Sequence, residues 1–327
     1  MVLSLIWGTL DAGLYTLGMK SVWGLVAAVA LVPVVCVQQS AAWGIDGHRL
    51  INRLAAGALP KDMPEFLRSA ATVEAMEYYG PEPDHWRSST EPELNAVGAP
   101  EHFMDMEYAD LIGVTLPRKR YDYIRALAYA QKLHLELPLT PEKVGLQPYA
   151  ASEAWERLKS AMRDYRTLAA EHKDTKPVEA EIVFTAGILG HWVADGSQPL
   201  HTTIQYNGWT GENPKGYTTL HRIHAQFESD YVKANVRAAR DVAPLIPAKA
   251  VVLGDVFDQY VVYLRHSQTL VEEVYKLEKA GGFTGAGTAA AKAFTEERLA
   301  AGATELRDLI YTAWVRSGDP VPIYRGS

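Results

Sequence analysis

The sequence predicts an all-α fold, because apolar residues recur three and four positions apart along most of the chain and alternating strand patterns are scarce. Leu50, Leu54 and Ala58 follow this spacing, and Ile124 and Leu127 repeat it further along. The chain has 327 residues, of which 48% are hydrophobic and 22% charged, so it can bury a full core. This composition excludes a disordered protein.

Five long helical stretches are expected after the first hundred residues. They cover residues 153–170, 178–195, 218–237, 252–279 and 288–316. Prolines and glycines separate the helical stretches, as at Pro60, Pro117 and Pro141. Residues 280–290, rich in Gly, Ala and Thr, are interpreted as a loop before the last helix, so we expect one domain from residue 43 to residue 327.

Residues 1–42 are interpreted as an export signal. Lys20 precedes a run without charged residues from 22 to 37, and residues 40–42 are the small residues Ser-Ala-Ala. Cleavage after residue 42 would make Trp43 the mature N-terminus of a periplasmic or secreted protein. A retained anchor is the alternative, although the run is short for a span of ~20 residues. Met19 is an alternative start.

The single cysteine and the net charge limit the classes of site. Cys36 lies inside the expected signal, so the mature chain would have no disulfide and no thiolate ligand. Any metal ion must therefore be held by nitrogen and oxygen. The formal net charge of −7 argues against a protein that coats nucleic acid, but a phosphodiesterase stays open, because bound cations would supply positive charge.

The segment from His191 to His201 is the most informative one. His191 and Asp195 are four residues apart on an expected helix, so they share a face and can bind one ion. Pro199 ends the helix and places His201 beyond it. Three potential ligands thus come from eleven residues.

A second pair with the same spacing follows at His224 and Glu228. A single histidine–carboxylate pair with this spacing is more often a surface ion pair that supports a helix. Two pairs together with His201 favour a metal site. His221 is a less suitable ligand, because Ala225 stands four residues after it.

Three further candidates lie nearer the N-terminus. His48 follows Trp43 closely, while Asp84 and His102 stand in expected loops. Each also has an ordinary interpretation, such as a turn residue for Asp84 or a hydrogen-bonded core histidine for His102. The remaining histidines without a second ligand at useful spacing are interpreted as structural or solvated, and they are His134, His172 and His266.

Together these residues resemble the superfamily of zinc-dependent phospholipases C and single-strand-specific nucleases, from Trp43 to about Tyr231. The HxxxD-xx-QP-x-H core of that family is matched from His191 to His201. Its mature chains begin with a tryptophan whose amine and carbonyl bind zinc, and Trp43 stands directly after the expected cleavage site. The resemblance implies a compact multi-helix domain with a cluster of three zinc ions at the bottom of a cleft.

The resemblance also implies nine ligands in three groups. These ligands are Asp84, His102, His191 and Asp195 for one ion, Trp43, His48 and the bridging Asp195 for the second, and His201, His224 and Glu228 for the third. Histidine and carboxylate ligands without cysteine suit zinc sites that keep open positions for water and substrate. Asp84 is the expected catalytic residue, since it can orient the attacking water or accept its proton.

The expected activity is hydrolysis of phosphate esters by metal-activated water. Glu228 is typical of the phospholipase C branch, whereas nuclease members have aspartate there, so we expect a phospholipase C-like phosphodiesterase that acts on phospholipid headgroups. A nuclease that cleaves single-stranded nucleic acid is the alternative, and a non-catalytic structural zinc module is the rival of another class. Asn207 is a candidate substrate-binding residue. We expect a monomer without a stable membrane span after processing.

Overall fold

The structure is a computed structural model that describes residues 43–113 and 115–321. The expected signal, Cys36 and the alternative start lie outside the described residues. Helices account for all regular structure in these two ranges, where the only strand-like pairings are isolated bridges between Met104 and Gly145 and between Tyr206 and Gly208. The predicted all-α class is therefore confirmed. The described residues lie in one compact unit, Ser40–Ser327.

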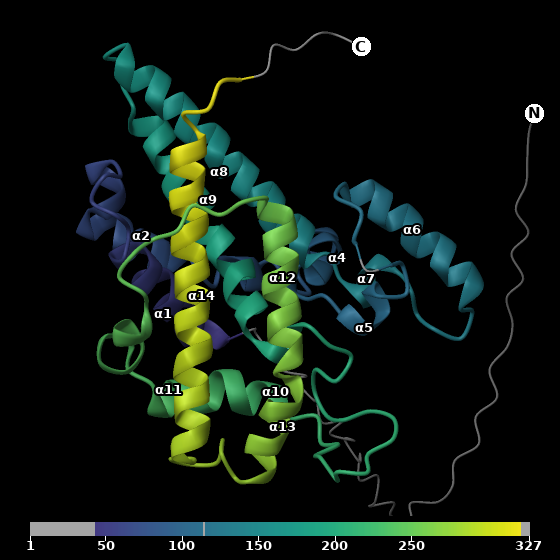
Figure 1. Cartoon of the computed structure of the whole chain (residues 1–327). Coiled ribbons are helices and arrows are strands. Elements are labelled where there is room, and N and C mark those ends of the chain that lie inside the picture. The colour runs from purple at the N-terminus through teal and green to yellow at the C-terminus, as the bar shows by residue number, and fades with distance from the viewer. Residues whose placement is uncertain (1–42, 114, 322–327) are drawn as a thin grey trace, which may run out of the picture. The chain divides into compact units, whose positions relative to one another are not determined.

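Fourteen α-helices are described in these ranges (Figure 1). The first seven are α1 Gly44–Gly57, α2 Ala70–Tyr79, α3 Glu82–His85, α4 Pro92–Gly98, α5 Met106–Ala109, α6 Arg120–Leu133 and α7 Pro141–Val144. The others are α8 Gln147–Ala170, α9 Lys176–Ser197, α10 Ile223–Ala225, α11 Val232–Asn235, α12 Val256–Thr269, α13 Val271–Lys279 and α14 Ala289–Arg316. Short 3₁₀ turns at Ala99–His102 and Pro199–His201 and a π-helical segment at Gln226–Tyr231 complete the parts used below.

Two of the expected long helices are wrong in detail. The stretch 218–237 begins as a helix only at Ile223, and it passes through the π segment before α11. The stretch 252–279 is divided into α12 and α13 at Leu270, whose N–H donates to the Ser267 carbonyl at 3.0 Å in a tighter turn. The other three stretches correspond to α8, α9 and α14, although α8 begins earlier than expected.

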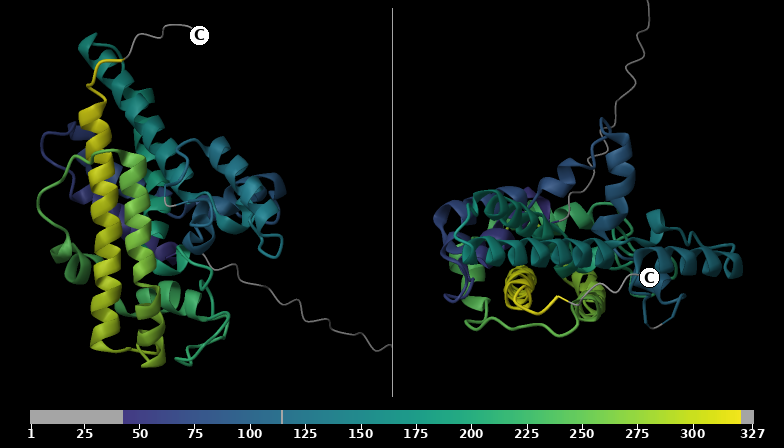
Figure 2. Two further views of the ribbon diagram at one scale, coloured as in Figure 1. Left: turned by 45° about the vertical axis from the view of Figure 1, so that its right-hand side comes forward. Right: turned by 90° about the horizontal axis from the view of Figure 1, so that it is seen from above.

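Helix α9 is the centre of the packing. It contacts α1, α2, α8, α12 and α14, and most of its C-terminal half is buried (Figures 1 and 2). This close approach depends on Gly190, because a Cβ there would lie 1.9 Å from the Asn52 side-chain oxygen. Among the described helices, none combines the length and apolar character that a bilayer crossing requires.

Candidate metal centre

Five side chains from four elements form what we call the first group. His48 comes from α1, Asp84 from α3, His102 from a 3₁₀ turn, and His191 and Asp195 from one face of α9. The Nε2 atoms of His48 and His191 lie 3.3 and 3.4 Å from the two Asp195 oxygens. Asp84 lies 3.8, 3.6 and 3.9 Å from Nε2 of His48, His102 and His191. These five residues are spread over 148 positions of the sequence, and the fold brings their side chains together.

His201, His224 and Glu228 form a second group beside the first. Their side chains make a triangle, with 3.1 Å between the two Nε2 atoms and 2.9 and 3.6 Å from Glu228 Oε2 to His224 and His201. The groups approach each other where His201 Nδ1 lies 4.0 Å from Asp195 Oδ2. The two clusters are thus parts of one centre.

Backbone carbonyls orient four of the five imidazoles. Because a carbonyl oxygen can only accept, each Nδ1 must carry the proton, which leaves the lone pair on Nε2 facing the centre. The pairs are His102 with Gly98 at 2.9 Å, His191 with Gly80 at 2.9 Å, His201 with His102 at 2.6 Å, and His224 with Tyr206 at 2.9 Å. Metal-binding histidines are typically held in this way.

Several inward-facing atoms of the centre are buried without a hydrogen-bond partner. They are His102 Nε2, His191 Nε2, Asp84 Oδ2, both Asp195 oxygens and Glu228 Oε1. Each such atom costs about 1–3 kcal/mol unless something binds it. Zinc bonds of about 2.0–2.1 Å in a tetrahedron would separate ligand atoms by roughly 3.3–3.4 Å, close to the spacings above. The residues therefore fit divalent cations held by nitrogen and oxygen.

Burial determines the protonation of the first group. It raises the pKa of Asp84 to about 6 and that of Asp195 well above its usual range. It also lowers the pKa of His191 to about 4 and that of His102 well below its usual value. The imidazoles of His102 and His191 are therefore neutral, which is the form that binds a metal, while the Asp195 carboxyl group would release its proton when a cation arrives.

Glu228 and His224 shift each other's pKa in the second group. Burial raises the pKa of Glu228, but the charges and hydrogen bonds of His224 and His201 outweigh it and lower the value to about 2. Burial lowers the pKa of His224, but the Glu228 carboxylate reverses this and raises it. The buried glutamate is thus ionised and ready to accept a cation.

The main chain of Trp43 contacts the second group, and the binding of a cation together with His48 stays a prediction. Its N–H donates to Glu228 Oε2 at 3.1 Å, and its indole donates to Ser197 Oγ at 2.8 Å. Gly44 makes this approach possible, because at its φ of 51° a Cβ would lie 2.7 Å from Ser229 Oγ. Trp43 itself is fully buried.

Asn207 lies next to His224 of the second group. Its side-chain oxygen accepts the His224 backbone N–H at 3.4 Å, so it holds the start of α10. A role in substrate binding stays a prediction. The three histidines interpreted as structural belong to neither group, and His134 has only a distant ion pair with Glu136 at 3.9 Å.

Sequence reasoning assigned no role to two residues of the centre. Arg87 stands three residues after Asp84, and its Nη1 donates to Asp84 Oδ1 at 3.4 Å while its Nε is buried without a partner. Gln198 donates from Nε2 to Glu228 Oε2 at 3.0 Å and accepts the Leu200 N–H at 2.6 Å. The spacing from Asp84 was the available signal for Arg87, since residues three apart on a helical turn are neighbours.

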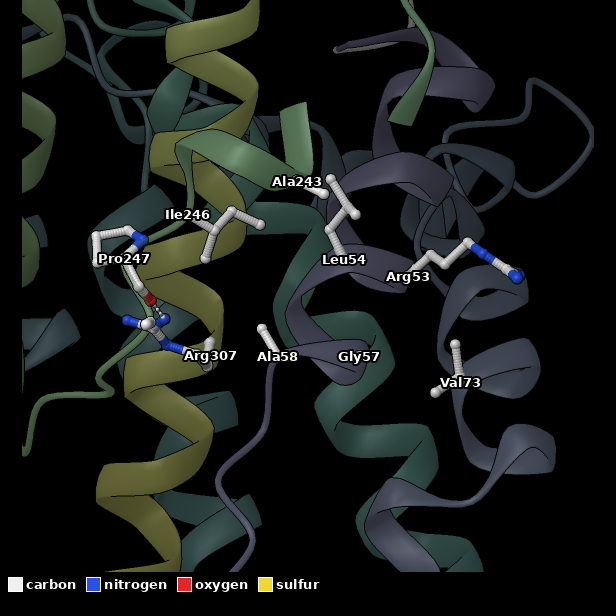
Figure 3. Close-up of a pocket in the computed structure, with 10 residues that line it drawn as sticks. Arg53, Leu54, Gly57, Ala58, Val73, Ala243, Ile246, Pro247 and Arg307 are labelled. Carbon is white, nitrogen blue, oxygen red and sulfur yellow. Dashed lines mark hydrogen bonds between the residues drawn. The ribbon is translucent and has the colours of Figure 1, made fainter. Parts of the chain in front are cut away.

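A separate groove of about 460 Å³ is lined by residues of α1, α2 and α14 and by residues 243–248 (Figure 3). Its lining includes Arg53, Leu54, Ile246 and Arg307. Both arginines are engaged elsewhere, because Arg53 pairs with Glu77 at 2.5 Å and Arg307 donates to the Pro247 and Lys249 carbonyls. The groove contains none of the candidate ligands, so the metal centre is the candidate functional site.

Comparison with models of known families, with curated proteins and with solved structures gives no match for this chain. The family resemblance therefore rests on the residues quoted above. The functional argument depends on the geometry of the two groups.

Proposed function

We propose that the protein is an exported, zinc-dependent phosphodiesterase of the phospholipase C and nuclease type, closest in character to a phospholipase C. One observation carries the proposal, namely that two adjacent histidine–carboxylate groups point buried, unpartnered ligand atoms at a common centre. Nine ligands for about three zinc ions leave fewer than four protein groups per ion, which is typical of catalytic sites with open positions. The absence of thiolates from this ligand set also favours catalysis.

When bound, the ions would lower the pKa of a water molecule and neutralise charge on the phosphoryl oxygens. The residues of the chain supply the remaining steps. Asp84 would orient that water and accept its proton at Oδ2, the oxygen without a partner. Arg87 would donate from Nε to a phosphoryl oxygen while Nη1 keeps its contact with Asp84.

Signal cleavage after residue 42 would complete the site. It would convert the Trp43 amide nitrogen, which donates to Glu228, into a free amine that can bind a cation. Export and activation would then be coupled, because the precursor lacks that ligand.

The test is hydrolysis of bis-p-nitrophenyl phosphate by the mature protein with zinc, with and without a chelator. We expect zinc-dependent turnover that His191→Ala abolishes. The matched control is His266→Ala, which removes an exposed imidazole of α12 and should leave turnover unchanged. Zinc-loaded protein without any turnover would instead support the structural zinc module.

A single-strand-specific nuclease is the second candidate, and Tyr206 favours it. The ring of Tyr206 is exposed and lies 6.2 Å from the His224 ring, where a base could stack on it. Rates on phosphatidylcholine and on single-stranded DNA, measured side by side with the same zinc-loaded protein, separate the two substrates. Faster cleavage of DNA would replace the phospholipase C assignment.

A further inference from the structure

Helix α6 has apolar residues on two opposite sides. Its inner side carries Tyr123, Leu127 and Ala130, which are buried and follow a spacing of four and three. Its outer side carries Tyr121, Tyr129 and Leu133, whose exposed fractions are 73, 66 and 64%, and Leu135 just beyond the helix is 83% exposed. Packing among the described residues therefore accounts for the inner side and leaves the outer side exposed.

The outer side has the composition of a helix that lies on a membrane surface. Tyr121, Arg125, Tyr129 and Leu133 follow one another at intervals of four, so they form one row, and Lys132 stands beside it. Arg125 and Lys132 are both exposed. Aromatic and aliphatic side chains flanked by basic residues suit the boundary between headgroups and acyl chains.

The position of α6 leaves this row accessible. In Figures 1 and 2 the helix lies at the periphery near α7, and its inner side contacts α8 through Tyr123 and Tyr149. Between Tyr121 and Leu133, Arg125 forms an ion pair with Asp122 on the same helix, so Lys132 supplies the net positive charge of this row. Such a surface suits a flat anionic bilayer, because the basic groups can meet lipid phosphates while the rings and leucines enter the interface.

Ion pairs and hydrogen bonds anchor α6 next to the metal centre. Arg120, its first residue, pairs with Glu101 at 2.7 Å and with Glu153 at 2.8 Å. Glu101 directly precedes His102 of the first group. The Tyr123 hydroxyl also donates to the Gly145 carbonyl at 3.2 Å. A surface bound at the outer row would therefore contact a helix that is fixed to the segment carrying His102.

We propose that the outer row of α6, Tyr121, Arg125, Tyr129, Lys132 and Leu133, docks the protein on a lipid bilayer that contains anionic headgroups. This docking surface goes beyond the proposed function, on which it rests only for its purpose of bringing the centre to membrane-held phosphate diesters. Docking itself needs no turnover.

The experiment is co-sedimentation of the mature, zinc-loaded protein with vesicles of phosphatidylcholine mixed with phosphatidylglycerol. We expect Tyr129→Ser combined with Leu133→Ser to weaken binding roughly tenfold or more, since both changes remove apolar area from the interface. Val262→Ser is the matched control, because it removes an exposed apolar residue from α12, and it should bind as the unchanged protein does. Arg125→Gln combined with Lys132→Gln should weaken binding to the mixed vesicles and not to phosphatidylcholine alone.

Two results would overturn the docking surface. One is the failure of the unchanged protein to bind the mixed vesicles, or equal binding by the serine variant. The other is self-association that the serine variant abolishes, because the row would then be an interface between copies of this chain. Hydrolysis of soluble bis-p-nitrophenyl phosphate is measured in parallel and should be the same in all variants. Vesicle binding without any such hydrolysis would refute the proposed function and leave the docking surface intact.

Discussion

The replacement Asn52→Ala tests how the packing supports the metal centre. Asn52 is fully buried on α1, one turn after His48. Its Nδ2 donates to the Met76 carbonyl of α2 and to the Gly187 carbonyl of α9, both at 2.8 Å. One side-chain amide thus joins three helices, two of which carry ligands of the first group.

The expected loss of stability follows from these two hydrogen bonds. Each contributes about 0.5–1.5 kcal/mol, and the alanine also leaves a small cavity between closely packed helices. We therefore expect Asn52→Ala to lower the free energy of unfolding by about 2–4 kcal/mol. Asn52→Asp should lower it further, because a carboxylate would face two carbonyl oxygens without the donor that both require.

Asn52→Ala should also change the metal centre, because it weakens the packing of α1 against α9. The rings of His48 and His191 stack with their centroids 4.0 Å apart, so a shift of α1 against α9 changes the spacing of their Nε2 atoms. We expect weaker zinc binding in Asn52→Ala, measured by titration against a competing chelator, and a lower rate at limiting zinc.

Urea denaturation followed by circular dichroism measures the change in stability, in zinc-loaded and zinc-free protein. The control is Asn95→Ala on α4, where the side chain is only partly buried and the change should stay within about 0.5 kcal/mol. A change of less than about 0.5 kcal/mol for Asn52→Ala, with unchanged zinc affinity, would show that Asn52 does not link helix packing to the metal centre.

Four further predictions concern the zinc content, the N-terminus at Trp43, Arg87 and Asp105. Metal analysis of the mature protein should find about three zinc ions, and one ion or none would contradict this count. His191→Ala should lower the zinc content, the rate of hydrolysis and the thermal stability. One extra residue before Trp43 should lower both zinc content and rate, whereas equal values would make Trp43 an ordinary core residue. Arg87→Gln should lower the rate of hydrolysis roughly a hundredfold at unchanged zinc content, and a normal rate would remove Arg87 from the proposed chemistry. Burial, reinforced by Glu107, raises the pKa of Asp105 to about 8, so the folded state binds this proton more tightly than the unfolded state. The stability that the protonated Asp105 contributes is therefore lost as the pH rises from about 4 to about 8. In a series of urea denaturations at different pH, Asp105→Asn should show a smaller loss. Equal pH dependence of the two proteins would contradict this prediction.

Local spacing explains what the sequence could predict. His191 with Asp195 and His224 with Glu228 were recognised because four residues on a helix bring two side chains to one face. The long helices α8, α9 and α14 have enough turns to show their periodicity. Helices α3 and α7 are single turns, which have no repeat to detect.

Contacts between distant segments could not be derived from spacing. His48, Asp84 and His102 joined the site only through the family resemblance, because their meeting depends on how α1, α3 and the turn before Phe103 pack against α9. The orienting carbonyls of Gly80, Gly98 and Tyr206 were also invisible, since every residue has a carbonyl group and only the fold selects which one faces an imidazole.

The burial of the centre also links ion binding to folding. Six ligand atoms are buried without a partner, and each costs about 1–3 kcal/mol against a total stability of ~5–15 kcal/mol. Protonation of Asp195 relieves part of this penalty in metal-free protein, and bound cations would give these atoms partners. Chelation should therefore lower thermal stability whether the ions are catalytic or structural. Loss of stability cannot separate those two roles, so zinc-dependent turnover, and its response to Arg87, is the measurement that decides between them.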